Sequence, residues 1–179
     1  MTYKRLWHIF RTALMKNGFK RAEYLRKTKV FAQMGQNCFW QPRNIPPEAE
    51  LIKMHDNVVV ASEVLFVNHD VMHHVFNHID AQHHYTAKFG AIEIGSNVFI
   101  GSRSVILPDT CIEDNVIIGA GSLVKGKLST GGVYAGVPAK RIGEFDAIWK
   151  KRAAEEPPVK DRAERFRNVW KQFDDKFAQ

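Results

Sequence analysis

The sequence predicts a mainly-β fold: a three-sided parallel β-helix with helical segments before and after it. The first observation is a six-residue repeat over residues 94–123, in which an aliphatic residue is followed four places later by Val, Ser or Thr. This period fits neither an amphipathic helix nor an isolated strand. The second observation is that residues that turn the chain at low cost stand at the expected corners. These are Asn97, Asp109, Asp114, Asn115, Gly121 and Gly126.

Each repeat supplies one short strand and one corner, and three repeats complete one coil of the column. Stacked coils bring equivalent aliphatic residues to about 4.7–4.9 Å, the spacing of neighbouring strands, so the interior should hold ladders of Ile and Val. The same period starts upstream at Met34, Trp40, Met54, Val60 and Phe66. It shifts by two residues after Pro46-Pro47, and an excursion is predicted over residues 72–93. Insertions of this kind often form the binding face of a repeat protein.

The repeat divides the chain into a basic helical segment (1–30), the β-helix (31–143) and a helical extension (144–179). In the first part Gly18 should separate a first helix from a second one over residues 21–29. The first helix has an apolar face formed by Leu6, Ile9, Phe10, Ala13 and Leu14. We expect the segment to cover the first coil, whose strand edge would otherwise be exposed. Alternatively, a basic amphipathic helix would bind anionic lipid at a membrane surface.

The last part carries apolar residues at helical spacing after Pro157-Pro158, a dipeptide that suits a helix start. They are Val159, Ala163, Phe166, Trp170, Phe173 and Phe177. We expect this stripe to pack on the β-helix or on a neighbouring subunit.

The formal net charge is +7, but the positive charge is concentrated in residues 1–30, where nine Lys or Arg stand against one acid, Glu23. The β-helix region has eight Lys or Arg against ten Asp or Glu, so it lacks the basic surface that nucleic acid binding needs. No run approaches the ~20 apolar residues of a membrane span, and no apolar signal core is expected. Cys38 and Cys111 form no metal or redox spacing and are interpreted as reduced packing cysteines. We therefore expect a cytoplasmic protein, with peripheral contact to the inner face of the membrane through residues 1–30 as a further hypothesis.

The run from Ile94 to Ser122, followed by Tyr134-Ala-Gly136-Val-Pro138-Ala-Lys140, resembles the hexapeptide-repeat acyltransferases over roughly residues 31–143. The resemblance implies a left-handed parallel β-helix, although crossovers between parallel strands are usually right-handed. Within the family, Asn68-His69 is similar to the xenobiotic acetyltransferases. The His-Asp pair and the Val-Phe-Asn stretch are similar to capsule and lipopolysaccharide O-acetyltransferases. The Gly-His-Pro segment that carries the base in galactoside and maltose acetyltransferases is absent.

Acyl transfer from a thioester to a hydroxyl needs a base that takes the hydroxyl proton, a task that suits histidine near pH 7. His69 is the preferred candidate because it stands at a corner position of the repeat that begins at Phe66, where its ring should leave the core. The family resemblance also places a base at this Asn-His motif. Asn68 is a candidate to orient the base or to bind the acceptor, and Asp70 should bond either His69 or a corner amide.

The excursion is rich in histidine and aromatic residues, which we interpret as the wall of an acceptor pocket. The candidate substrate-binding residues are His73, His74, Phe76 and Tyr85. A metal site is the alternative, since the spacings of four between some of these histidines suit one face of a helix. No Cys or carboxylate completes a recognisable ligand set, so no metal is expected.

The resemblance implies acetyl-CoA as the acyl donor, lying in a groove between neighbouring columns. Its pantetheine arm would bond backbone amides near Ser102 and Ala120, and Lys125 is a further candidate contact. Lys140 and Arg141 would meet the CoA phosphates. Because adjacent subunits complete such grooves, the resemblance also implies a homotrimer.

The sequence therefore predicts an acetyl-CoA-dependent O-acetyltransferase that acts on a saccharide hydroxyl, with His69 as general base. One alternative is an N-acetyltransferase of an amino-sugar nucleotide. Another is a zinc-dependent protein of the γ-carbonic anhydrase type, which needs three convergent histidines where only His55 and His69 lie on the coils. The third alternative is a trimer that serves as a scaffold and has no enzymatic activity.

Overall fold

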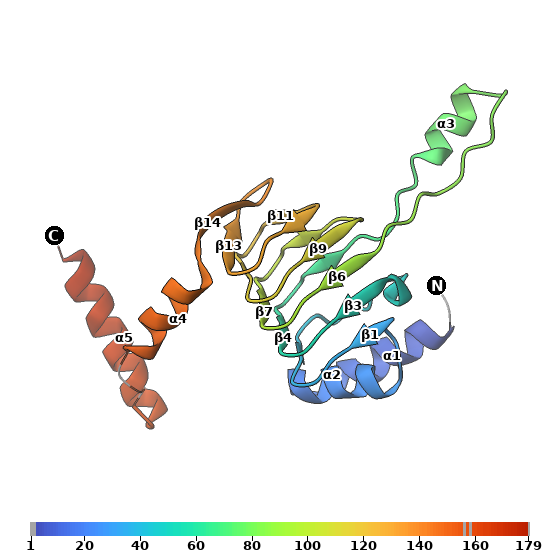
Figure 1. The fold of residues 1–179 in the computed structure, drawn as a ribbon. Helices are drawn as coiled ribbons and strands as arrows, with labels where there is room; N and C mark the ends of the chain where they lie inside the picture. Colours follow the sequence, from blue (N-terminus) through green and yellow to red (C-terminus); the bar gives the residue numbers. More distant parts are fainter. Residues whose placement is uncertain (1–2, 156, 158, 179) are drawn as a thin grey trace. The chain divides into compact units, whose positions relative to one another are not determined.

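The computed structural model describes residues 3–155, 157 and 159–178 and contains a parallel β-helix (Figure 1). The chain divides into two compact units, Met1–Asp146 and Ala147–Gln179. The first contains the β-helix with its amino-terminal helices. Helix α4 (Phe145–Ala153) begins at the end of the first unit, and α5 (Arg162–Phe177) belongs to the second. Among the described residues, no helix is both long and apolar enough to cross a membrane.

Three sheets form the sides of the column in the described part of the chain. The first sheet contains, in spatial order, β1 (Gln33–Met34), β3 (Ile52–Met54), β6 (Ile92–Ile94), β9 (Thr110–Ile112) and β12 (Lys127–Leu128). The second contains β2 (Phe39–Trp40), β4 (Val58–Val60), β7 (Val98–Ile100), β10 (Ile117–Ile118), β13 (Gly132–Ala135) and β14 (Lys140–Glu144). The third contains β5 (Leu65–Phe66), β8 (Val105–Ile106) and β11 (Leu123–Val124). The strands pair in parallel, except that β14 is antiparallel to β13.

The predicted aliphatic ladders are confirmed. In the first sheet Met54 pairs with Ile94, and Ile94 pairs with Ile112; all three are fully buried. The residues four places after each repeat start also point inward, and the hydroxyls of Ser104 and Ser122 both donate to the carbonyl of Gly119. Each buried Ile contributes roughly 2–3 kcal/mol, so these ladders are the main stabilising element of the column.

The corners also follow the prediction in large part. The backbone has a positive φ at the predicted corner residues Asn97, Asp109, Asn115, Gly121 and Gly126. Asp114 does not adopt this conformation, and its carboxylate instead accepts a bond from the amide of Ser96. Glu63 and Arg103 have positive φ although neither residue type favours it, and their side chains form an ion pair at 2.7 Å.

The amino-terminal segment caps the first coil, as predicted. Helices α1 (Tyr3–Ala13) and α2 (Gly18–Lys27) are joined by a short turn, and the side chain of Asn17 caps α2 by accepting from the amide of Phe19. Gly18 is therefore the first residue of α2 and not a divider. Helix α2 packs on β1 and β2, with Leu25 fully buried and Arg21 donating to the carbonyl of Trp40 at 2.8 Å.

The excursion forms an arm with its own stem and helix (Figure 1). Its stem is an antiparallel pairing in which the amide of Gly90 donates to the carbonyl of Asn68 and that of Asp70 donates to the carbonyl of Lys88. Helix α3 (His73–Ile79) lies beyond the stem. The predicted bounds of 72–93 were wrong: the arm spans residues 68–90, and residues 92–94 already belong to the column as β6.

In the second unit, α5 begins later than the prolines suggested, after Asp161, whose carboxylate accepts from the amide of Glu164. Pro158 lies outside the described residues. The predicted apolar stripe is helical from Ala163 onward, whereas Val159 lies before α5; the rings contact one another in the pairs Trp170–Phe173 and Phe173–Phe177. The two cysteines differ: Cys38 is buried as predicted, whereas Cys111 is exposed, so the packing role predicted for Cys111 is wrong.

Candidate active site

His69 was expected at a corner of the coil; it lies instead in the stem of the arm, where it forms an antiparallel bridge with Phe89. Its side chain is 30% exposed, so the ring does leave the core. Nδ1 lies 2.9 Å from Oε2 of Glu48, and the ring centroid lies 5.6 Å from that of Phe89. Because Nδ1 is engaged by the carboxylate, Nε2 is the nitrogen that can accept a proton from a substrate.

The sequence analysis did not identify Glu48 as a residue of the site. It precedes the short 3₁₀ turn η1 (Ala49–Leu51), which follows Pro46-Pro47 at the end of the first coil. The pairing of Met34 with Met54 places Glu48 one coil below His69, at the same edge of the column. The proximity of Glu48 to His69 could have been predicted by counting positions around successive coils. The two extra residues after Pro46-Pro47 made the equivalent positions difficult to assign.

The side chains of the two residues that flank His69 form hydrogen bonds with the backbone of the arm. Asn68 is buried; its amide nitrogen donates to the carbonyl of Gly90, and its Oδ1 has no hydrogen-bond partner among the described residues. Asp70 has neither of the two partners considered: its carboxylate accepts from the backbone amide of Met72, which lies in the arm directly before α3 and not at a corner of the column. Both side chains therefore fix the backbone on either side of His69.

The predicted substrate-binding residues gather on the arm. The rings of His73 and His74 lie 4.0 Å apart, and those of Phe76 and Tyr85 lie 5.4 Å apart. The hydroxyl of Tyr85 donates to Asp80 at 2.7 Å, and this bond, followed by further donors from Gln82 and His83, lowers the pKa of the Asp80 carboxyl. These contacts organise the arm internally and do not bring Phe76 or Tyr85 against His69 in the described structure.

Two of the predicted donor-binding residues lie at a different edge of the column from His69. Ser102 and Ala120 occupy the corner between the second and third sheets, where the amide of Gly121 donates to the carbonyl of Ser102 at 2.8 Å. A Cβ on Gly101 would lie 2.5 Å from the amide nitrogen of Ala120, so only glycine lets these corners stack this closely. Lys125 is exposed and lies between β11 and β12, at the edge between the third and first sheets, which is also the edge of His69.

The two predicted phosphate-binding cations begin β14, directly after the Gly-Val-Pro-Ala turn. Lys140 is exposed. Arg141 is paired with the carboxylate of Glu144, which raises the pKa of Arg141. Lys140 is therefore the more available of the two for a phosphate.

Within one chain, the structure does not bring His69 together with the corner residues Ser102 and Ala120. His69 lies at the edge between the third and first sheets, whereas Ser102 and Ala120 lie at the edge between the second and third. The whole width of the third sheet separates these two edges.

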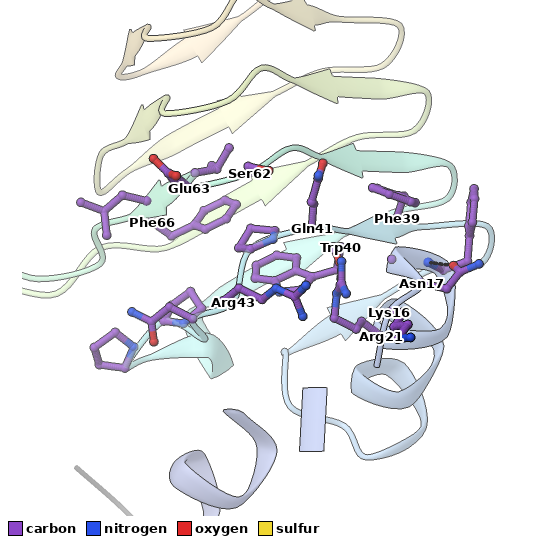
Figure 2. Close-up of a pocket in the computed structure, with 18 residues that line it drawn as sticks. Lys16, Asn17, Arg21, Phe39, Trp40, Gln41, Arg43, Ser62, Glu63 and Phe66 are labelled. Carbon is purple, nitrogen blue, oxygen red and sulfur yellow. Dashed lines mark hydrogen bonds between the residues drawn. The ribbon is translucent and has the colours of Figure 1, made fainter. Parts of the chain in front are cut away.

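A hollow of about 810 Å³ lies at the foot of the donor edge, between the start of α2 and the corners of the first two coils (Figure 2). Sequence reasoning did not find it. Its lining combines aromatic rings with polar and charged side chains, among them Phe39, Trp40, Phe66, Lys16, Arg43 and Glu63. The ring of Trp40 stacks on that of Phe66, and its Nε1 is buried without a hydrogen-bond partner in the described residues. Both rings are buried, so the exposed side chains that line the hollow include Phe19, Leu65, Lys16, Arg43 and Glu63.

The zinc alternative gains no support from the described residues, in which no three His, Cys, Asp or Glu side chains gather to hold a metal ion. The second histidine on the coils, His55, is engaged elsewhere: its Nε2 lies 3.0 Å from Glu93.

Comparison with known proteins supports the predicted family. Residues 91–126 match the model described as bacterial transferase hexapeptide (six repeats). The chain is 31% identical over 112 residues to WbbJ of Escherichia coli K12, a protein named for O-acetyl transfer in lipopolysaccharide biosynthesis; the match covers 57% of this chain and 56% of WbbJ. It is 30% identical over 138 residues to a galactoside O-acetyltransferase of Lactococcus lactis, covering 66% of this chain and 67% of that protein. The chain thus spans between about half and two thirds of these relatives.

Among solved structures, a galactoside acetyltransferase in complex with coenzyme A superposes with a TM-score of 0.61 and 25% identity, covering 88% of each chain. This similarity exists although the Gly-His-Pro segment of the galactoside enzymes is absent here. The predicted fold, a left-handed parallel β-helix with terminal helices, is confirmed by these matches and by the parallel sheets. The chain belongs to the hexapeptide-repeat acyltransferases.

Proposed function

We propose that the protein is an acetyl-CoA-dependent O-acetyltransferase that transfers an acetyl group to a saccharide hydroxyl. The observation that carries this proposal is the pair formed by His69 and Glu48, which leaves Nε2 available at the root of an arm that projects from the column. The relatives support the reaction class, since their names describe O-acetyl transfer and one was solved with coenzyme A.

The reaction follows from this geometry as a single displacement. Nε2 of His69 takes the proton from the sugar hydroxyl while its oxygen attacks the thioester carbonyl carbon. The carbon–sulfur bond then breaks, and the leaving CoA thiolate recovers the proton from the imidazolium. Glu48 holds Nδ1–H and offsets the positive charge that the ring carries between the two proton transfers.

We also propose that the enzyme is a homotrimer, because His69 and the corner residues Ser102 and Ala120 lie on different edges of one column. Two sides of the column are apolar on the outside and the third is polar. The outward residues of the second sheet, in register, are Phe39, Val59, Phe99 and Ile117, and those of the third are Leu65, Val105 and Leu123. The outward residues of the first sheet are Gln33, Lys53, Glu93, Cys111 and Lys127. Two different apolar sides suit a ring of subunits, in which one subunit's donor edge meets the arm of the next.

In such a trimer, acetyl-CoA would lie along Ser102 and Ala120 of one subunit, with Lys140 and Arg141 near its phosphates, and Lys125 would come from the His69 edge of the neighbouring subunit. The hollow beside Trp40 and the arm of the neighbouring subunit are the places proposed for the saccharide. The donor is an intracellular metabolite and both cysteines are free, so we propose a cytoplasmic enzyme.

The test is release of free thiol from acetyl-CoA against a panel of sugars. We expect His69→Ala to lower turnover by about 10²–10⁴-fold with little change in the Kd for CoA, because the base acts in the chemical step and not in donor binding. His84→Ala, an exposed histidine on the arm, is the matched control and should keep full turnover.

Full turnover in His69→Ala would refute the assignment of the base. Turnover confined to amino-sugar nucleotides would identify an N-acetyltransferase instead. A protein that neither releases thiol nor binds CoA would be a non-enzymatic scaffold.

A further inference from the structure

Helix α1 turns its large apolar side chains toward solvent. The exposed set, at 44–93% exposure, is Tyr3, Leu6, Trp7, Phe10 and Leu14. Positions 3, 7, 10 and 14 follow one another at spacings of four, three and four, so their side chains form a continuous stripe along the helix. We call these five residues the α1 stripe.

Polar contacts on the opposite side of α1 hold the stripe outward. Nε of Arg5 donates to the carbonyl of Ile45 at 2.7 Å, and Nδ1 of His8 lies 2.9 Å from the hydroxyl of Tyr24. Thr12 is buried, and Ile9 packs on the core. The apolar face predicted from the sequence is therefore divided: Ile9 packs inward, while the aromatic residues on the other side stay exposed.

The surroundings of the α1 stripe are basic. The sequence contains no Asp or Glu before Glu23. The exposed cations on or next to the helix are Lys4, Arg11, Lys16 and Lys20. The guanidinium of Arg11 lies 5.8 Å from the ring centroid of Trp7, so a cation borders the stripe directly. Any partner of this face must therefore accept aromatic side chains and supply negative charge.

We propose that the α1 stripe docks on an anionic lipid bilayer, with α1 lying in the plane of the interface. Trp and Tyr side chains favour the boundary between headgroups and acyl chains, and Lys and Arg are attracted by anionic headgroups. With 11 residues, α1 is about 16 Å long, so it would lie on the membrane and not cross it. A second copy of the chain is the less suitable occupant, because two such faces would bring Lys4 and Arg11 of both copies together and α1 itself contains no acid.

The experiment measures sedimentation of the full chain with vesicles of phosphatidylcholine alone or mixed with phosphatidylglycerol. We expect binding to the mixed vesicles only. Lys4→Gln combined with Arg11→Gln should weaken it roughly 30-fold, the loss expected for two surface cations. Trp7→Ser combined with Phe10→Ser should weaken it roughly tenfold or more. The matched controls are Lys53→Gln with Lys88→Gln for charge and Ile79→Ser for exposed apolar area, and both should bind like the original protein.

A second measurement identifies the residue that enters the bilayer. Lipids with brominated acyl chains should quench tryptophan fluorescence in the original protein, and Trp7→Phe should keep binding while losing the quenching. Equal binding to neutral vesicles, no binding to either, or quenching that persists in Trp7→Phe would overturn the proposal. So would a change in oligomeric state in Trp7→Ser with Phe10→Ser. None of these readouts needs acyl transfer, so this proposal and the proposed activity can fail independently.

Discussion

A carboxylate beside a histidine does not by itself identify a catalytic base in this protein. Among the described residues, His55, His69 and His83 each lie within 3.0 Å of an acid. His69 is the least exposed of the three and the one at the root of the arm. The Asn-His motif selected His69 as the candidate base, but the acid partner of His69 comes from 21 residues earlier and no local pattern marks it.

Glu48 is predicted to position His69 and to stabilise its charged form. We expect Glu48→Ala to lower kcat by roughly 10–10²-fold, and Glu48→Gln to lower it less, because the amide oxygen can still accept Nδ1–H. The KM for acetyl-CoA should stay unchanged, since Glu48 lies away from the donor edge. A Glu48→Ala enzyme that loses Tm and raises KM together would indicate a structural role instead.

At the scale of elements, the arm is stabilised by contacts within itself. Asn77 bonds both the amide and the carbonyl of Tyr85, and Asp80 accepts from the hydroxyl of Tyr85 and contacts His83. Helix α3 contains no buried residue, so polar bonds replace a hydrophobic core there. The sequence predicted that these residues leave the column. It did not predict that they form a helix whose side chains are hydrogen-bonded to the segment that follows it in the arm.

The arm should loosen in acid before the column does. Because the Tyr85 hydroxyl lowers the pKa of Asp80, the stabilisation is complete above the ordinary Asp pKa of about 3.9 and is lost as pH falls through the lowered value. The protection of α3 amides against hydrogen exchange should therefore decrease once the pH falls through the lowered pKa of Asp80, while the amides of β7 stay protected. In Tyr85→Phe, we expect this loss of protection at higher pH. Identical profiles for the two proteins would contradict this account.

At the scale of the whole molecule, the outward side chains of the column are arranged as regularly as the inward ones, with apolar residues on two sides and polar residues on the third. The second and third sheets present apolar residues outward, and the first presents polar and charged ones. Phe99, 41% exposed, stands at the middle of the apolar ladder between Val59 and Ile117. In the proposed trimer, the two apolar sides would form the interfaces that bring the donor edge of one column to the arm of the next.

Phe99→Glu should dissociate the trimer, because a charge would be buried in the proposed interface without a partner. We expect a monomer by light scattering, an unchanged circular dichroism spectrum and turnover reduced roughly tenfold or more. Lys53→Glu, on the polar side, is the control and should leave the assembly and turnover unchanged. A monomeric original protein would refute the shared site.

The β-helix could be predicted from the sequence because the residues that determine it act over a short range. An aliphatic residue at every sixth position and a turn-forming residue at each corner interact within one or two coils. Asn97, Asp109 and Asn115 adopt the expected corner conformation for this reason. The pairing of His69 with Glu48, the stem of the arm and the outward turn of the α1 stripe required three-dimensional coordinates. Each depends on contacts between segments far apart in the chain, and such contacts follow from how the inserted residues close and pack, not from any repeating pattern.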